Sequence, residues 1–154
     1  MESKRYLDGR GWIDPDTLPI NADGFRCCRY CQQSVKPPKR TFCSKICVHE
    51  YRLRSCGSYL RSCVFARDKG ICAICGVDTK DIAKLISDTD GNLREQILKN
   101  YNIHKTRKIT PYKNGGGLWD ADHIIPVKDG GGTCGMENIR TLCISCHKLI
   151  TFSK

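Results

Sequence analysis

The chain has 154 residues and a formal net charge of +10, from 26 lysines and arginines against 16 aspartates and glutamates. A hydrophobic content of 40% is enough for one modest core, and the polar start of the chain predicts neither a signal peptide nor a membrane span. We therefore expect a protein that is not secreted and stays in a reducing compartment, where its 12 cysteines favour zinc over disulfides.

The N-terminal part of the chain predicts an irregular arm followed by a zinc finger. Residues 1–25 show no clear periodicity. Residues 26–50 contain Cys28-x2-Cys31 and Cys43-x3-Cys47, a spacing typical of a zinc finger with four cysteine ligands. Either Cys27 or His49 could replace one of these four ligands. We expect residues 26–154 to form one compact unit that begins with this finger.

The middle of the chain predicts helices around a first zinc knuckle. Within the segment 51–79, a helix over 50–69 should bend near Gly57 and lead into Cys72-x2-Cys75. Residues 80–117 predict a helical insert with helices over 81–87 and 93–101, the second opened by a capping box of Asn92 and Glu95. The basic stretch 102–117 that follows could grip a DNA backbone or be an ordinary solvated linker.

The segment 118–154 predicts a hairpin and a helix, with strands over 118–127 and 139–143 and a helix over 145–152. Neighbouring residues of a strand point to opposite faces, so Asp122 and His123 can share a site only where the strand ends or distorts. We expect the strand to end there. The pair Cys143-x2-Cys146 should join Cys72 and Cys75 in a closed, structural zinc site.

The polar residues of this last segment suit phosphodiester hydrolysis, which needs an activated water and a cation near the phosphate. A neutral imidazole at His123 could be the general base. Asp122 and His147 could hold a divalent ion and leave other coordination positions open. Asn138 could cap a turn, and by holding that loop it could also orient His123.

The whole pattern, Asp-His-x14-Asn-x8-His followed through the second CxxC, resembles the HNH endonucleases of the ββα-metal superfamily. The resemblance implies an α+β fold, a small zinc-stabilised ββα-metal core with an N-terminal zinc finger and a helical insert. It also implies that His123 is the base, that Asp122 and His147 bind catalytic magnesium or manganese, and that Asn138 orients the base or adds a metal contact.

Within that family, the segments 118–123, 130–132 and 138–143 resemble the nuclease domain of annealing helicases. That likeness implies cleavage of DNA, with branched or fork-like substrates, products with 5′-phosphate and 3′-hydroxyl ends, and a helicase or translocase partner. It further implies a nuclear location if the source is eukaryotic, and a cytoplasmic one otherwise.

Two other functions remain open from the sequence. The chain could be a zinc-finger module without catalysis that binds or recruits nucleic acid, or a protein-interaction finger, which Phe42-Cys43-Ser44 favours. The charge distribution supports a nucleic-acid partner, because residues 1–69 hold 14 basic and 7 acidic side chains whereas residues 118–154 hold 4 of each. We expect a polyanion to be held mainly by the N-terminal two-thirds of the chain.

Overall fold

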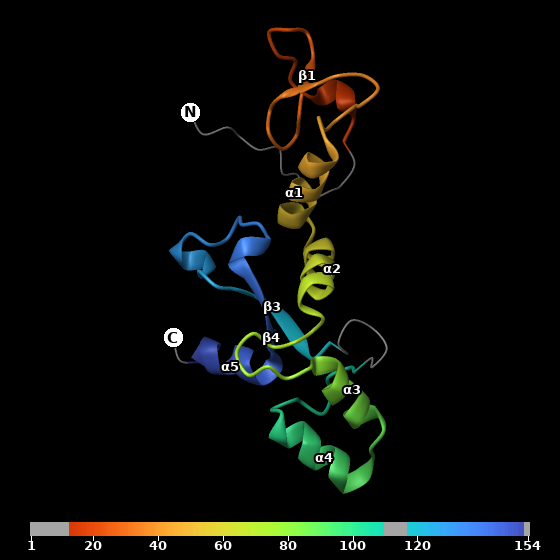
Figure 1. Cartoon of the computed structure of the whole chain (residues 1–154), viewed down its shortest axis with the longest axis vertical. Coiled ribbons are helices and arrows are strands. Elements are labelled where there is room, and N and C mark those ends of the chain that lie inside the picture. Colours follow the sequence, from red (N-terminus) through yellow and green to blue (C-terminus); the bar gives the residue numbers. More distant parts are fainter. Residues whose placement is uncertain (1–12, 110–116, 153–154) are drawn as a thin grey trace. The chain divides into compact units, whose positions relative to one another are not determined.

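The computed structural model describes residues 13–109 and 117–152 (Figure 1). Contacts group the chain into two compact units, unit 1 up to Leu60 and unit 2 from Arg61. The sequence-based domain boundaries, and the single unit expected over 26–154, stay predictions. Residues 1–12 of the predicted arm and 110–116 of the basic linker lie outside the described residues. Among the described residues, no helix combines the length and apolar character that a bilayer span requires.

Unit 1 is a short hairpin followed by a helix. A 3-10 turn, η1 (Pro15–Thr17), precedes β1 (Arg26–Cys27), which pairs antiparallel with β2 (Ser34–Val35). Its core gathers Cys28, Val35 and Cys47, with Phe42 packed against them. So few apolar side chains make a small core, and a bound metal would supply much of the stability.

The helix predicted over 50–69 is two helices, α1 (Lys45–Ser55) and α2 (Gly57–Asp68). The predicted interruption near Gly57 is confirmed, because Cys56 between the helices is extended at φ −133°. The predicted start was five residues too late. Ser44 caps α1, and its hydroxyl accepts a hydrogen bond from the backbone N–H of Cys47 at 3.1 Å.

In unit 2, the insert consists of α3 (Thr79–Ser87) and α4 (Gly91–Asn100). Ile82, Ala83 and Ile86 of α3 and Ile97 and Leu98 of α4 form a buried apolar cluster together with Ile103 and Leu118, which lie outside the two helices. Asp78 caps α3 through a hydrogen bond from the N–H of Lys80 at 2.8 Å. The predicted capping box at Asn92 is wrong, because the residue that precedes α4 is Asp90 and its side chain makes no capping hydrogen bond.

The C-terminal part of unit 2 is a hairpin followed by a helix. The strands β3 (Trp119–His123) and β4 (Ile139–Cys143) are antiparallel, with Trp119 opposite Cys143 and His123 opposite Ile139, and α5 (Ile144–Phe152) follows directly. The short 3-10 turns η2 (Val127–Asp129) and η3 (Met136–Asn138) lie between the strands. The predicted α+β class with a ββα order is confirmed. The first strand is shorter than the predicted 118–127 and ends at His123.

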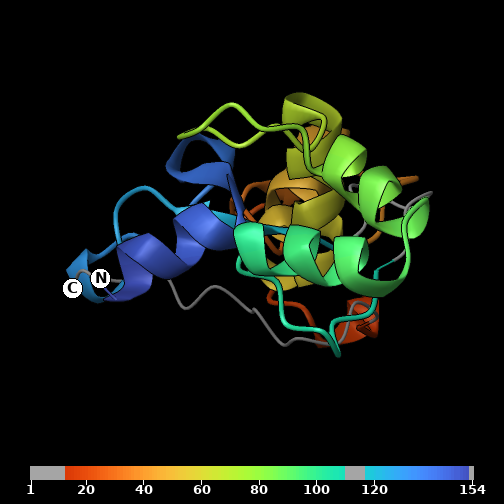
Figure 2. The ribbon, with the colours of Figure 1, turned by 90° about the horizontal axis from the view of Figure 1, so that it is seen from below.

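Figure 2 shows α4 and α5 next to each other in unit 2. Two side chains of α5 join them. The Ser145 hydroxyl donates a hydrogen bond to the Tyr101 carbonyl at 2.5 Å, and the Lys148 ammonium donates to the Asn102 carbonyl at 2.8 Å. The helical insert therefore braces the helix that carries His147.

Candidate functional site

Two groups of four cysteines come together, and each is the set that the spacing predicted. The sulfur atoms of Cys28, Cys31, Cys43 and Cys47 lie within 4.8 Å of one another, as do those of Cys72, Cys75, Cys143 and Cys146. Four thiolates around one zinc ion are about 3.8 Å apart. The sulfur–sulfur separations of 3.4 Å for Cys31 and Cys43 and 3.7 Å for Cys75 and Cys143 are close to that value. Each tetrad could therefore hold a zinc ion.

The alternative ligand His49 has another partner. Its Nδ1 lies 2.9 Å from the Tyr59 hydroxyl, and the four sulfurs of the first tetrad meet without it.

The thiol pKa values also suit a bound cation. Burial alone would raise the pKa of Cys72, but backbone N–H groups of Cys75 and Cys143 outweigh it and lower the pKa to about 6. Burial and the neighbouring thiols raise the pKa of Cys146. Formation of one thiolate is therefore favoured and formation of the next is opposed, and a bound divalent ion would favour the thiolate form of all four cysteines by direct coordination.

The second tetrad fixes the start of α5. Cys72 and Cys75 lie on the knuckle after α2, Cys143 ends β4, and Cys146 lies in the first turn of α5. A backbone hydrogen bond from Ala73 to Thr141, 2.8 Å long, adds a direct link between the knuckle and β4. The residue that follows Cys146 is His147, so the orientation of this imidazole depends on the tetrad.

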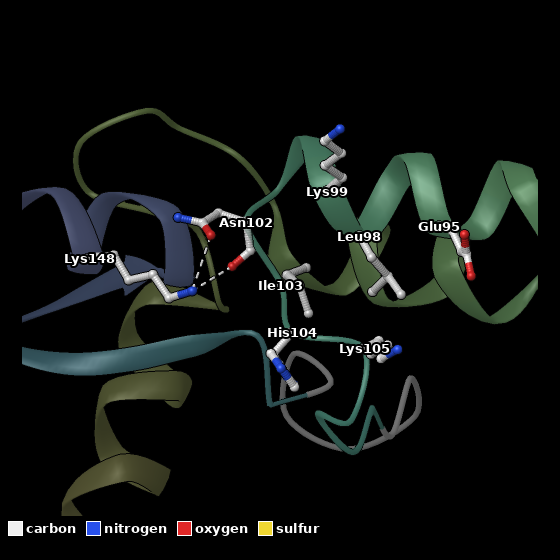
Figure 3. Close-up of a pocket in the computed structure, with 8 residues that line it drawn as sticks. All are labelled: Glu95, Leu98, Lys99, Asn102, Ile103, His104, Lys105 and Lys148. Carbon is white, nitrogen blue, oxygen red and sulfur yellow. Dashed lines mark hydrogen bonds between the residues drawn. The ribbon is translucent and has the colours of Figure 1, made fainter.

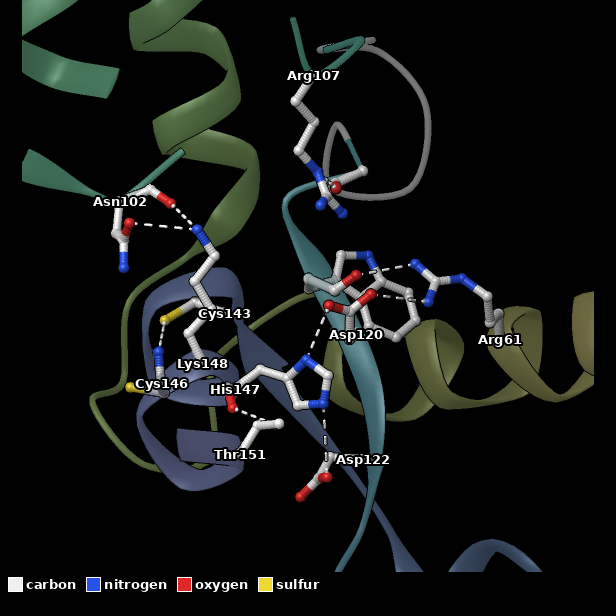
Figure 4. A network of polar contacts seen from close by, with 12 residues as sticks. Arg61, Asn102, Arg107, Asp120, Asp122, Cys143, Cys146, His147, Lys148 and Thr151 are labelled. Atoms are coloured by element: carbon white, nitrogen blue, oxygen red, sulfur yellow. Dashed lines mark hydrogen bonds and ion pairs between the residues drawn. The ribbon is translucent and has the colours of Figure 1, made fainter. Parts of the chain in front are cut away.

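Two carboxylates of β3 face this imidazole (Figure 4). Because side chains alternate along a strand, Asp120 and Asp122 lie on the same face. His147 lies between them, with Nδ1 at 3.1 Å from an Asp120 oxygen and Nε2 at 3.8 Å from Oδ1 of Asp122. The arrangement brings together two predicted metal ligands, Asp122 and His147.

The second oxygen of Asp122 is already paired. Arg140, opposite Asp122 in the hairpin, donates to Oδ2 from Nε at 3.0 Å and from Nη2 at 2.9 Å. Oδ1 is left facing His147. Two ligand atoms of one small divalent ion are at most about 4.2 Å apart, so the 3.8 Å between Oδ1 and Nε2 fits a shared ion.

His123 is the last paired residue of β3 and is half-buried. The strand ends there, as expected. The terminal residue of a strand can leave the alternation, so His123 is at the position where its side chain can share a site with Asp122. Within residues 13–109 and 117–152 its imidazole has no hydrogen-bonding partner, so both ring nitrogens are available. Its role as general base stays a prediction.

Asn138 holds the loop that follows His123. Its Oδ1 accepts from the Ile125 N–H at 2.8 Å, and its Nδ2 donates to the carbonyls of Ile125 at 3.1 Å and Gly131 at 3.0 Å. A Cβ on Gly131 would overlap the Ile125 carbonyl oxygen, so only glycine fits this turn. Asn138 thus acts on the loop backbone. This supports the predicted loop-holding role over a direct metal contact.

A hollow of about 460 Å³ lies beside α5, between α4 and the loop after it (Figure 3). Lys148 is bound to Asn102 at one side, and three more basic side chains line the hollow against a single acidic one. The residues that line it are Glu95, Leu98, Lys99, Asn102, Ile103, His104, Lys105 and Lys148. The basic character predicted for residues 102–117 therefore begins one turn earlier, at Lys99, and includes a residue of α5.

Sequence reasoning missed Asp120 and Arg140. Asp120 could have been found from the predicted strand, because period-two alternation places it on the face of Asp122. The position of Arg140 opposite Asp122 depends on the register between 119–123 and 139–143, which the predicted strand over 118–127 did not define.

Comparison with known proteins identifies the family of this chain. Residues 109–152 match the family model described as HNH endonuclease. The mouse and human proteins named "DNA annealing helicase and endonuclease ZRANB3" are 33% and 31% identical over 143 residues, covering 84% of this chain. The chain spans 13% of the length of these relatives.

Among solved structures, the crystal structure of the human ZRANB3 HNH domain is 33% identical, with a TM-score of 0.46, and the match covers 62% of this chain and 86% of that domain. The family match and the sequence identity with these relatives confirm the predicted resemblance to a nuclease of this kind. With the aspartate, the asparagine and both histidines of the motif inside the matched segment, this chain belongs to the HNH endonuclease family.

Proposed function

We propose that the protein is a metal-dependent endonuclease that hydrolyses DNA phosphodiester bonds. The observation that carries the proposal is the 3.8 Å separation between Asp122 Oδ1 and His147 Nε2, with their other polar atoms held by Arg140 and Asp120. One oxygen and one nitrogen suit magnesium or manganese and leave positions for water and phosphate. When bound, such an ion neutralises charge on the phosphate and on the departing oxygen.

The protein's own groups then have separate tasks. His123 takes a proton from the attacking water, since its ring is not engaged by another described residue. Asn138 keeps the chain after His123 in one conformation through its three hydrogen bonds to the loop. Arg140 holds Asp122 in place and adds a positive charge next to the site.

The substrate and context follow from the relatives. Two proteins similar to this chain are named DNA annealing helicases and endonucleases, which supports DNA as the substrate, fork-like or branched DNA as a preferred form, and a helicase or translocase partner. The products would carry 5′-phosphate and 3′-hydroxyl ends. The same likeness supports a nuclear location in a eukaryote.

The lysines that line the hollow beside α5 support this hollow as the binding path of the DNA backbone. Lys148 lies next to His147 on α5, and Lys99 and Lys105 line the same hollow. Contacts between lysines and phosphates position a strand without reading its sequence. A strand held in this hollow would approach the Asp122–His147 pair from α5.

The test is a cleavage assay on labelled single-stranded, duplex, flap and fork DNA across a magnesium and a manganese titration. Replacing His123 by alanine should lower kcat by about 10²–10⁴-fold, the usual contribution of a general base. His49→Ala is the matched control, because His49 belongs to unit 1 and contacts Tyr59. Zinc content and circular dichroism of each variant check the fold.

The competing function, a zinc-finger module that binds or recruits nucleic acid without cutting it, gives a different result. DNA would bind with a steep salt dependence, and neither divalent ions nor His123 would matter. A folded, zinc-loaded His123→Ala protein that cuts as fast as the parent would contradict the proposed mechanism.

A further inference from the structure

We propose that Asp120 is a positioning residue that fixes the tautomer and the direction of His147, so that Nε2 is the atom presented to the catalytic ion. The inference rests on the proposed function, since it concerns how one of the proposed metal ligands is held.

The hydrogen-bond chemistry of His147 leads to this assignment (Figure 4). Nδ1 lies 3.1 Å from Oδ2 of Asp120. An ionised carboxylate only accepts hydrogen bonds, so Nδ1 is the donor. A neutral imidazole carries one N–H, which leaves Nε2 with a lone pair. That lone pair faces Oδ1 of Asp122 at 3.8 Å, and two acceptors opposed in this way suit a cation between them.

Asp120 is itself held by a rigid group. Its Oδ1 lies 3.7 Å from Nη1 of Arg61, whose Nη2 donates to the Trp119 carbonyl at 2.9 Å. The Arg61 guanidinium lies over the Trp119 indole, 4.2 Å from its centre, and that indole is fully buried against Phe65. The carboxylate direction is therefore set by the hydrophobic core, through an arginine that cannot lose its charge.

Asp120 does not act as a third ligand in this arrangement. Among the described residues, Asp120, Asp122 and His147 do not offer three ligand atoms within 4.8 Å of one another, whereas both cysteine tetrads do. The imidazole separates the two carboxylates. Asp120 therefore acts on the ion through His147, as outer carboxylates commonly do for metal-bound histidines.

The experiment measures the tautomer and the metal affinity separately. Nitrogen-15 NMR of histidine-labelled protein reports which ring nitrogen of His147 carries the proton, without metal and with magnesium. Electron paramagnetic resonance gives the Kd for manganese. The variants are Asp120→Ala, Asp120→Asn and, as a matched control, Asp81→Asn, a carboxylate in the first turn of α3.

In the parent, Nδ1 should carry the proton and Nε2 should respond to magnesium. Asp120→Ala should shift the proton toward Nε2 and weaken manganese binding by about 10–100-fold, the usual effect of losing an outer partner. The proton position and the manganese affinity of Asp120→Asn should lie between those of the parent and those of Asp120→Ala, because the amide oxygen still accepts a hydrogen bond. Asp81→Asn should match the parent, and thermal unfolding shows that each variant is folded.

His147→Ala and Asp122→Ala separate failure of this inference from failure of the proposed function. If both lose manganese while Asp120→Ala keeps the parental tautomer and Kd, the role of Asp120 is overturned and the metal site stands. If both bind manganese like the parent, the metal site is wrong. A parental His147 that carries protons on both nitrogens in the presence of magnesium also overturns the inference.

Discussion

The two cysteine tetrads offer the same four sulfur ligands in different surroundings. The tetrad of unit 1 joins a short hairpin to α1, and Arg29 stacks beside it over the rings of Tyr51 and Phe42, at 4.4 and 5.5 Å. The tetrad of unit 2 joins a knuckle to β4 and α5, with polar residues of the candidate site directly adjacent. Unit 1 therefore uses its ligands to hold a small fold, whereas unit 2 also uses them to orient an imidazole.

The largest difference between the two units should appear when one cysteine ligand is removed from each tetrad. Cys47→Ser and Cys146→Ser should each lose one of two zinc ions, measured by mass spectrometry. Because binding of a structural zinc is worth roughly 10 kcal/mol or more, each loss should unfold its surroundings. Cys146→Ser should abolish both manganese binding and DNA cleavage, since His147 loses its anchor.

Cys47→Ser should keep manganese affinity within about threefold of the parent, as expected when the two units fold independently. Loss of cleavage in both variants, with the manganese site intact only in Cys47→Ser, would mean that unit 1 also delivers the substrate. If Cys47→Ser and Cys146→Ser lose manganese binding equally, the two tetrads do not act separately and the two units form one cooperative structure.

A smaller difference between the two units is expected when one turn-holding asparagine is replaced in each of them. Asn138 in unit 2 and Asn21 in unit 1 both hold a turn through their side chains, and Asn21 Oδ1 accepts from the N–H groups of Asp23 and Phe25. Asn138→Ala should cost about 2–4 kcal/mol of unfolding free energy, at roughly 1 kcal/mol for each lost bond plus the unpaired buried groups. It should also slow cleavage, because the loop after His123 loses its three bonds.

Asn21→Ala should cost less, about 1–2 kcal/mol, because its partners are more exposed. Cleavage should be unchanged. Denaturant unfolding followed by zinc release and the cleavage rate of the folded variants measure both effects. A slower rate in Asn21→Ala would show that the turn of unit 1 contributes to catalysis.

The smallest expected effect concerns DNA affinity. Lys99→Glu and Lys105→Glu, both in the hollow beside α5, should each weaken DNA binding severalfold and lower the slope of log K against log salt by about 1. Both substitutions should raise KM for DNA and leave kcat unchanged. Lys84→Glu on α3, outside the hollow, should have little effect.

Arg40→Glu extends the same comparison to unit 1, where Arg40 is exposed in the finger. Anisotropy titrations at several salt concentrations measure each variant. If Arg40→Glu weakens DNA binding as much as Lys105→Glu does, the finger is a second DNA contact, as the charge distribution along the chain suggests.

The parts that the sequence predicted well depend on local spacing. Both tetrads follow from CxxC pairs, and the strand over 139–143 has the predicted bounds because buried apolar residues and Cys143 define it. The predicted element bounds that were wrong depend on side chains that bond the backbone near the ends of the elements. The hydroxyl of Ser44 starts α1 early, and the side chain of Asn138 takes the backbone of Ile125 out of the first strand.

The contact between Asp120 and His147 could not be predicted from spacing. The two residues are 27 positions apart, and they meet only because α5 packs along the face of β3 that carries the aspartates. Alternation indicates that face, but which helix covers it depends on tertiary packing.

The turn at Gly131 limits how this loop can change in evolution or in the laboratory. A Cβ on Gly131 would overlap the Ile125 carbonyl oxygen, so a side chain at this position requires the loop to open. Gly130 next to it has φ +91°, where any other residue would be strained. Lys128 and Asp129 are exposed at the tip. Insertions or reporter groups should therefore be tolerated at the tip, whereas a single methyl group at the base would release the chain that leads away from His123.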